Sequence, residues 1–266
     1  MSVQVLVAAM HQKDHSILKK MNIQSDAIII NQCERNEFEK FKYQGHEILL
    51  YSLNERGVGR SRNNALMRAS KDICLFSDED MIYVDGYAEL ISNEFKKNPN
   101  ADVIIFSLES LNKDKPLSVI RQNKRVRRKE AMRYGCARIA FKRESVLKKN
   151  IWFSLLFGGG AKYSSGEDTI FLQDCLKKGL KVYKSTIKIA DVKQEKSTWF
   201  NGYTEKLFFD KGVLLATVMP KIARFYALGL SYKYWKNKSV TMSFWDIYNA
   251  MKNGIDGKKN VMEKGN

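Results

Sequence analysis

Short apolar runs alternate with segments of helical spacing along the first hundred residues of the chain. The runs carry few polar positions, as in strands that are buried on both faces of a sheet. Helical periodicity is found at residues 14–21, 57–69 and 86–97. Strands that alternate with helices predict an α/β fold with a mostly parallel sheet. The predicted strands are residues 2–10, 26–30, 47–51, 73–76 and 103–106, with two more at 137–141 and 181–183.

The pattern changes towards the end of the chain. Residues 167–178 still have the spacing of an amphipathic helix that covers a sheet. Beyond residue 202, apolar and aromatic residues alternate with lysines, and Pro220 interrupts them. We therefore predict two domains, an α/β domain at residues 1–201 and an amphipathic helical extension at residues 202–266, whose last dozen residues are expected to fray.

The composition adds a strong positive charge to this picture. The 266 residues carry 46 Lys and Arg against 29 Asp and Glu, a net charge of +17, and the hydrophobic content of 44% suffices for a core. Fourteen Lys and Arg against three Asp and Glu lie in residues 111–150, and nine against three follow Pro220. Such surfaces indicate an anionic partner, which is a nucleotide, nucleic acid, an anionic lipid or an acidic glycan.

The cysteines and the N-terminus indicate a cytoplasmic location. The four cysteines are scattered, no CxxC pair occurs, and neither a disulfide framework nor a zinc site is indicated. The N-terminal apolar run lacks a preceding basic region, so it is interpreted as a strand and not as a signal peptide. No apolar run approaches the length of a membrane span.

The first candidate for chemistry is the acidic triplet Asp78-Glu79-Asp80, which follows the predicted strand at residues 73–76. Ligands of open α/β sheets bind beyond the carboxyl ends of the strands. Two carboxylates at such a place suit Mg²⁺ or Mn²⁺, which take one or two carboxylates together with substrate phosphates. The alternative is an acidic loop without a metal.

A second acidic group, Gly166-Glu167-Asp168, follows a glycine-rich stretch and begins the predicted helix at residues 167–178. Acidic residues in a first helical turn are favoured by the helix dipole, which is a purely structural explanation. The functional explanation is a general base beside a loop, since deprotonation of a hydroxyl group requires a carboxylate within hydrogen-bonding reach.

The third candidate is the segment GVGRSRNNAL, residues 57–66, in which two glycines begin a helix that carries Arg62. It lacks the third glycine of a dinucleotide fingerprint and the GK[ST] of a P-loop. Contact with a nucleotide and a solvated basic helix start both remain open for this segment.

Taken together, these segments resemble family 2 inverting glycosyltransferases of the GT-A fold, in particular bacterial enzymes of capsular and cell-surface polysaccharide assembly. The resemblance covers roughly the first two hundred residues. It depends on the order of four segments: VLVAAM, GVGRSRNNAL, LFSDED and FGGGAKYSSGEDTIF. It implies a Rossmann-like, mostly parallel sheet flanked by helices, with the C-terminal helices as an extension.

The resemblance also implies roles for individual residues. Asp80 is similar to the second acid of the family's DxD motif, which holds Mn²⁺ or Mg²⁺ on the donor diphosphate, and Asp78 is similar to the first acid, near the ribose and the metal. Asp168 is similar to the base that deprotonates the acceptor hydroxyl. The remaining implied positions are Arg62 and Glu79 for the nucleotide-sugar, and Gly159, Gly160 and Glu167 for the acceptor.

One departure from the family concerns the base of the nucleotide. Many relatives carry an acidic residue after the second strand to contact uracil, whereas this chain has Asn31-Gln32. An amide offers both a donor and an acceptor to the uracil edge, so the expected donor remains a UDP-sugar.

The implied reaction is a direct displacement with inversion, in which the acceptor is a glycan or a lipid-linked glycan. The cationic and aromatic C-terminal helices suggest peripheral binding to the inner face of the cell membrane, against the alternative of a solvated helix face. Two other functions were weighed, a sugar nucleotidyltransferase and a non-enzymatic nucleic-acid-binding protein. The first lacks its glycine-rich, lysine-containing signature, and the second lacks any familiar binding motif.

Overall fold

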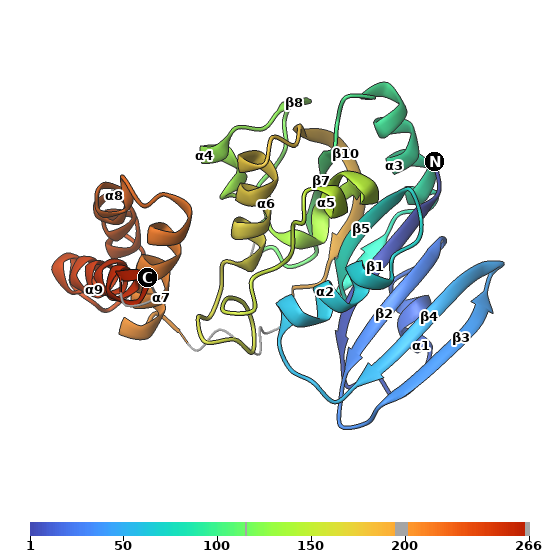
Figure 1. The fold of residues 1–266 in the computed structure, drawn as a ribbon, viewed down its shortest axis with the longest axis horizontal. Coiled ribbons are helices and arrows are strands. Elements are labelled where there is room, and N and C mark those ends of the chain that lie inside the picture. The colour runs from blue at the N-terminus through green and yellow to red at the C-terminus, as the bar shows by residue number, and fades with distance from the viewer. Residues whose placement is uncertain (115, 195–201, 264–266) are drawn as a thin grey trace.

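The computed structural model describes residues 1–114, 116–194 and 202–263, which form one large mixed sheet, helices on both of its faces and a helical C-terminal part (Figure 1). The strand order is β3-β4-β2-β1-β5-β9-β7-β10-β6, and β8 pairs with β10. Strands β1, β2, β4, β5, β7 and β10 run in one direction, so the sheet is mostly parallel. The strands are β1 Val3–Met10, β2 Asp26–Gln32, β3 Glu37–Tyr43, β4 His46–Leu53, β5 Ile73–Asp78, β6 Met81–Tyr83, β7 Val103–Ser110, β8 Lys124–Arg125, β9 Ile139–Lys142 and β10 Val182–Val192.

The helices on both faces explain why the central strands are apolar at most positions. Side chains of β1 alternate between two cores: Val5 and Val7 face the core beneath α1 and α3, and Leu6 faces the core beneath α2, α5 and α6. The helices of this part are α1 Ser16–Lys20, α2 Val58–Arg68, α3 Tyr87–Lys97, α4 Arg128–Ala131, α5 Arg143–Lys148 and α6 Glu167–Lys177, with a short 3₁₀ helix at Cys136–Arg138.

The C-terminal helices α7 Glu205–Val218, α8 Ala223–Trp235 and α9 Phe244–Glu263 share an apolar core of their own. Helices α7 and α9 cross closely at Gly212, where an added Cβ would lie 1.9 Å from the Met251 carbonyl oxygen. Only glycine permits this approach. Helix α7 also packs on the α/β part, where Val213 lies in one apolar cluster with Ile170 of α6. The predicted boundary at residue 201 lies outside the described residues, and the division into two domains stays a prediction.

The predicted α/β class and mostly parallel sheet are confirmed, with three local corrections. Strand β3 was not predicted, and β10 continues nine residues past the predicted end at residue 183, to Val192. Helix α9 continues to Glu263, where fraying was expected. Over the part of the chain that the structure describes, no helix has both the length and the apolar character to cross a membrane.

Candidate active site

One cavity of about 890 Å³ lies at the carboxyl ends of the parallel strands β1, β2 and β5. It brings together the two acidic groups that the sequence singled out, although ninety residues separate them in the chain. The side chains and loops around it come from the ends of β1, β2, β5 and β10 and the starts of α2 and α6. Its walls include Ala8, Met10, Gln12, Gln32, Val58, Arg62, Asp78, Glu79, Asp80, Gly159, Gly166, Glu167, Asp168, Lys193 and Gln194.

Arg62 joins the two acidic groups. Its guanidinium donates to Asp78 Oδ1 at 2.8 Å and to Glu167 Oε1 at 2.9 Å, while its side chain is only 5% exposed. The guanidinium also lies over the Phe153 ring, 5.4 Å from the centroid. A rigid planar fork suits this bridge between two carboxylates better than a lysine would. Arg62 therefore fixes Asp78 relative to the start of α6.

Tight packing around α2 places Arg62 at this point. A Cβ at Gly59 would lie 2.7 Å from the Ser154 carbonyl oxygen, so only glycine allows α2 to approach this loop so closely. The next turn is fixed by Asn63, whose amide donates to the Phe153 carbonyl at 3.0 Å and accepts from the Phe153 N–H at 2.8 Å. These contacts explain Gly59 and Asn63 of the segment at residues 57–66.

Glu167 has both carboxylate oxygens engaged within the protein. Oε1 accepts from Arg62, Oε2 accepts from the Gly166 N–H at 3.1 Å, and the residue is 8% exposed. Gly158 makes room for this carboxylate, since a Cβ there would lie 2.9 Å from it, and its φ of +106° favours glycine. These contacts support a positioning role for Glu167 and do not support the predicted direct contact with an acceptor.

Asp168, the predicted base, lies half-buried in the wall of the cavity. One carboxylate oxygen accepts from the Thr169 N–H at 2.7 Å. Burial, and next the charge of Glu167, raise the pKa of Asp168 to about 7, while Arg62 acts in the opposite direction. A carboxylate with a pKa near neutrality is well matched to take a proton from a hydroxyl group.

The three carboxylates of the acidic triplet have different surroundings, and Asp78 is already bonded to Arg62 through one oxygen. Asp78 and Asp80 both line the cavity, and burial, followed by the charge of Asp78, raises the pKa of Asp80 to about 6. Glu79 instead accepts from the Met10 N–H at 3.2 Å and from the Gln12 amide at 2.6 Å. Glu79 thus holds the segment after β1 in place.

Asp78 and Asp80 together fit a hard divalent cation of the kind that the sequence implies, because Asp78 has one oxygen that Arg62 does not occupy and both residues line the cavity. Two carboxylates beside an open cavity provide oxygen ligands whose mutual repulsion a cation would relieve. No group of three or more His, Cys, Asp or Glu side chains within the described ranges forms a closed metal cage. Mg²⁺ and Mn²⁺ do not need such a cage when substrate phosphates complete their coordination.

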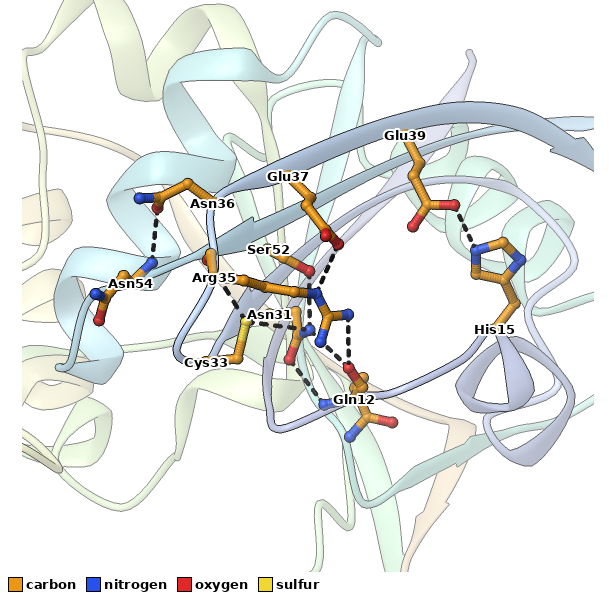
Figure 2. A network of polar contacts seen from close by, with 10 residues as sticks. All are labelled: Gln12, His15, Asn31, Cys33, Arg35, Asn36, Glu37, Glu39, Ser52 and Asn54. Carbon is orange, nitrogen blue, oxygen red and sulfur yellow. Dashed lines mark hydrogen bonds and ion pairs between the residues drawn. The ribbon is translucent and has the colours of Figure 1, made fainter.

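Asn31 is placed differently from the prediction. Figure 2 shows its amide facing the Gln12 backbone, from which Oδ1 accepts at 2.9 Å and to which Nδ2 donates at 3.0 Å. The same Nδ2 donates to Ser52 Oγ, and Asn31 is 1% exposed and absent from the cavity wall. Direct contact of Asn31 with a nucleotide base is not supported, because its amide is satisfied within the protein.

Gln32 and Gln12 present amide groups to the cavity. Gln32 Oε1 accepts from the Gly57 N–H at 2.8 Å. Its Nε2 group takes no part in this bond and remains as a donor. Gln12 Nε2 donates to Glu79 and to the Met10 carbonyl, which leaves its Oε1 as an acceptor. Arg35 and Asn31 both contact the Gln12 carbonyl and thereby hold this residue (Figure 2).

Two further placements bear on the predicted site. Gly159 lines the cavity and its carbonyl accepts from the Val58 N–H, whereas Gly160 is exposed and lies outside the wall. Three residues of the cavity wall were not predicted from the sequence: Gln12, Lys193 and Gln194. The sequence could have indicated Lys193 and Gln194 only through their position directly after β10, and that strand was predicted to end at residue 183.

Comparison with known proteins bears on the family and the fold. Residues 15–144 match the family model described as "Glycosyl transferase family 2". A search of curated proteins gives no match. Among solved structures, S. aureus TarS 1–349 in complex with UDP-GlcNAc aligns with a TM-score of 0.63 and 13% identity, over 90% of this chain and 74% of that chain. The structure of S. aureus TarS 1–349 in complex with UDP aligns with a TM-score of 0.60 and 13% identity, over 90% of this chain and 73% of that chain.

A longer TarS structure aligns with 97% of this chain but only 50% of its own length, at 14% identity and a TM-score of 0.62. At these identities the structural likeness establishes the fold alone. Two parts of the resemblance are confirmed: residues 15–144, about half of the chain, match the family 2 glycosyltransferase model, and the fold is of the GT-A type.

Proposed function

We propose that this protein is an inverting glycosyltransferase that moves a sugar from a UDP-sugar to a glycan or lipid-linked glycan acceptor in bacterial capsule or surface polysaccharide synthesis. The observation that carries the proposal is the single cavity in which Arg62 connects Asp78 to Glu167, with Asp80 and Asp168 in the same wall. One guanidinium thus connects the donor-side Asp78 to Glu167, the neighbour of the proposed base Asp168.

The proposed reaction is a direct displacement at the anomeric carbon. Asp168 takes the proton of the acceptor hydroxyl as the acceptor oxygen forms its bond to that carbon. The bond between the carbon and the diphosphate oxygen breaks with its electron pair, and UDP leaves. After burial, the charge of Glu167 raises the pKa of Asp168 and the charge of Arg62 lowers it.

Asp80 and Asp78 would hold Mn²⁺ or Mg²⁺ on the donor diphosphate. When bound, the cation supplies positive charge that stabilises the leaving diphosphate. Lys193, whose backbone N–H donates to the Asp80 carbonyl at 3.1 Å, adds a protein cation at the same wall. A site with both signs of charge is suited to an anionic donor with its metal.

The uridine part of the proposal depends on Gln32 and Gln12. A free amide donor on Gln32 and a free amide acceptor on Gln12 complement an edge such as that of uracil, which carries carbonyl acceptors beside an N–H donor. The bound UDP and UDP-GlcNAc of the TarS structures concern a protein with the same fold, and they support this choice of nucleotide.

On the acceptor side, the proposal assigns Gly159 and the nearby Gly160 to the border of the site, with Glu167 behind Asp168. The four free, buried cysteines and the proposed substrates suit a cytoplasmic enzyme with peripheral access to a membrane.

A thermal-shift panel tests the proposal. UDP and UDP-sugars with Mn²⁺ are expected to raise the unfolding temperature more than GDP or TDP does. Asp80→Asn should remove the part of the shift that requires Mn²⁺. An equal response to all nucleotides, or a UDP response that ignores both the metal and Asp80→Asn, would contradict the donor assignment.

A further inference from the structure

Helix α8 carries an exposed apolar stripe that the transfer reaction does not use. The stripe consists of Ile222, Phe225, Leu228, Tyr232 and Trp235, with exposed fractions of 45%, 76%, 38%, 55% and 45%. Spacings of three and four residues place these side chains along one side of the helix. Large apolar side chains that gather on one helix face indicate an interaction surface.

The opposite side of α8 already supplies the packing that the helix needs. Ala223, Ala227 and Ser231, four residues apart, are buried against α7 and α9. The stripe therefore does not belong to the core of the C-terminal helices. Figure 1 places α8 at the end of the molecule opposite β3.

Cations surround the stripe. Lys236 lies over two of its rings, 4.7 Å from the Trp235 centroid and 5.6 Å from the Tyr232 centroid. Lys221 directly precedes the stripe and is exposed. A long ammonium side chain above an aromatic ring allows the ring to enter an apolar layer while the charge remains at a polar surface.

A second group of cations is fixed beside the start of α8. Arg128 donates to the Val218 carbonyl at 3.3 Å, and Met132 packs on the same helices, so α4 adjoins the turn between α7 and α8. Arg127, Lys129 and Arg133 of this segment are exposed. None of these three has a carboxylate partner among the residues that the structure describes.

We infer that the α8 stripe, together with the cations of α4 and of Lys221 and Lys236, docks the protein on an anionic lipid bilayer. An aromatic and aliphatic helix face that lies in the headgroup region, with Lys and Arg beside it, is the arrangement by which a helix binds at an interface without crossing it. The positive charge favours anionic lipid over a second copy of this chain, because two such faces would repel each other.

The docking surface also adjoins the proposed acceptor side. Residues 133–135 lead from α4 to the cavity, where a Cβ at Gly135 would lie 3.6 Å from Asp168 Oδ2. A bilayer on the α8 stripe would therefore lie near the base that is proposed to meet the acceptor. Docking itself is independent of the transfer reaction, and its test requires neither donor nor metal.

Vesicle flotation of the full chain tests the inference. Vesicles in which a third of the lipid is phosphatidylglycerol should carry the protein, vesicles of phosphatidylcholine alone should carry far less, and 1 M salt should release it, since salt at about that concentration screens charges beyond about 3 Å. This comparison needs no variant. Equal flotation with both lipids, or none with either, would overturn the inference.

Variants identify the surface. Phe225→Ser with Trp235→Ser should lower the partition coefficient at least about tenfold, because two large apolar side chains no longer leave water. Lys221→Gln with Lys236→Gln should lower it about thirtyfold, since each lysine near an anionic surface contributes about 1 kcal/mol. Phe38→Ser, an exposed aromatic residue on β3 at the far end of the molecule, is the matched control and should change nothing.

Thermal unfolding of each variant verifies that it is folded, and the single Phe225→Ser variant replaces the double variant if that one is not. Unchanged flotation of folded stripe variants would overturn the inference. A wild-type dimer that the stripe variants dissociate, without flotation of either protein, would overturn it in favour of self-association. Donor binding measured without vesicles is expected to be the same in all stripe variants, which separates this surface from the proposed function.

Discussion

Replacement of Glu167 by Gln should move the pH dependence of transfer towards lower pH. The pKa of Asp168 is raised from 3.8 to about 7, which corresponds to about 4 kcal/mol against its charged form. Burial is the first cause and the charge of Glu167 the second. A single like charge in such a site contributes about one pKa unit or more, so Glu167→Gln should lower the pKa of Asp168 to about 6.

The sign follows from the role of Asp168 as a base. Only its ionised form accepts a proton, so the turnover number rises with pH through the pKa. With a pKa of about 7, roughly a tenth of Asp168 is ionised at pH 6 and roughly nine-tenths at pH 8. The ratio of turnover at pH 6 to that at pH 8 should therefore rise from about 0.1 in the wild type to about 0.5 in Glu167→Gln.

The assay is steady-state turnover at saturating donor from pH 5 to pH 9. The ratio is internally normalised, so a general loss of activity through a weakened Arg62 contact leaves it interpretable. Glu144→Gln removes an exposed carboxylate outside the cavity and should retain the wild-type ratio. An unchanged ratio in Glu167→Gln would refute either the role of Asp168 or the coupling of the two carboxylates.

Three further predictions concern packing and nucleotide binding. Gly158→Ala should destabilise the fold by about 2 kcal/mol or more in denaturant titrations, since its Cβ would meet Glu167 at 2.9 Å, whereas Gly179→Ala, also at positive φ but in open space, should cost only about 1 kcal/mol. Gly254→Ala would place a Cβ 2.1 Å from the Phe209 carbonyl oxygen and should expose the C-terminal helices to proteolysis, whereas Gly229→Ala on α8, with nothing nearby, should be neutral or slightly stabilising. Asn31→Ala should raise the dissociation constant for UDP about tenfold in a calorimetric titration, because the Gln12 N–H loses its partner and the Gln12 carbonyl keeps only Arg35; unchanged affinity would disprove the positioning role.

The sequence predicted the central sheet because its strands are apolar at nearly every position. Edge strand β3 was not predicted, since EFEKFKY is mostly charged, its aromatic residues do not alternate regularly with the charges, and it has a single neighbour, β4. Strand β10 was cut short because it contains polar residues such as Lys184. In the fold this lysine is buried and forms an ion pair with Glu130, a contact that no local pattern reveals.

The candidate site was predictable where its functional groups lie close together in the sequence, as Asp78 and Asp80 do. The contacts that organise it join distant parts of the chain: Arg62 reaches Glu167 across 105 residues, and Gln12 reaches Glu79 across 67. Side chains that the resemblance assigned to ligands, such as Asn31 and Glu167, are engaged inside the protein. Only the three-dimensional contacts distinguish residues that are free to touch a ligand from residues that hold those ligand-binding residues in place.

The most direct measurement pairs UDP binding with UDP-sugar turnover for the wild type, Asp80→Asn and Asp168→Asn in the presence of Mn²⁺. The account predicts that Asp80→Asn loses both metal-dependent binding and turnover. It predicts that Asp168→Asn binds UDP with nearly wild-type affinity and transfers no sugar, because the base acts on the acceptor and not on the donor. Near-normal turnover by Asp168→Asn, or a wild-type protein that does not bind UDP, would contradict the account.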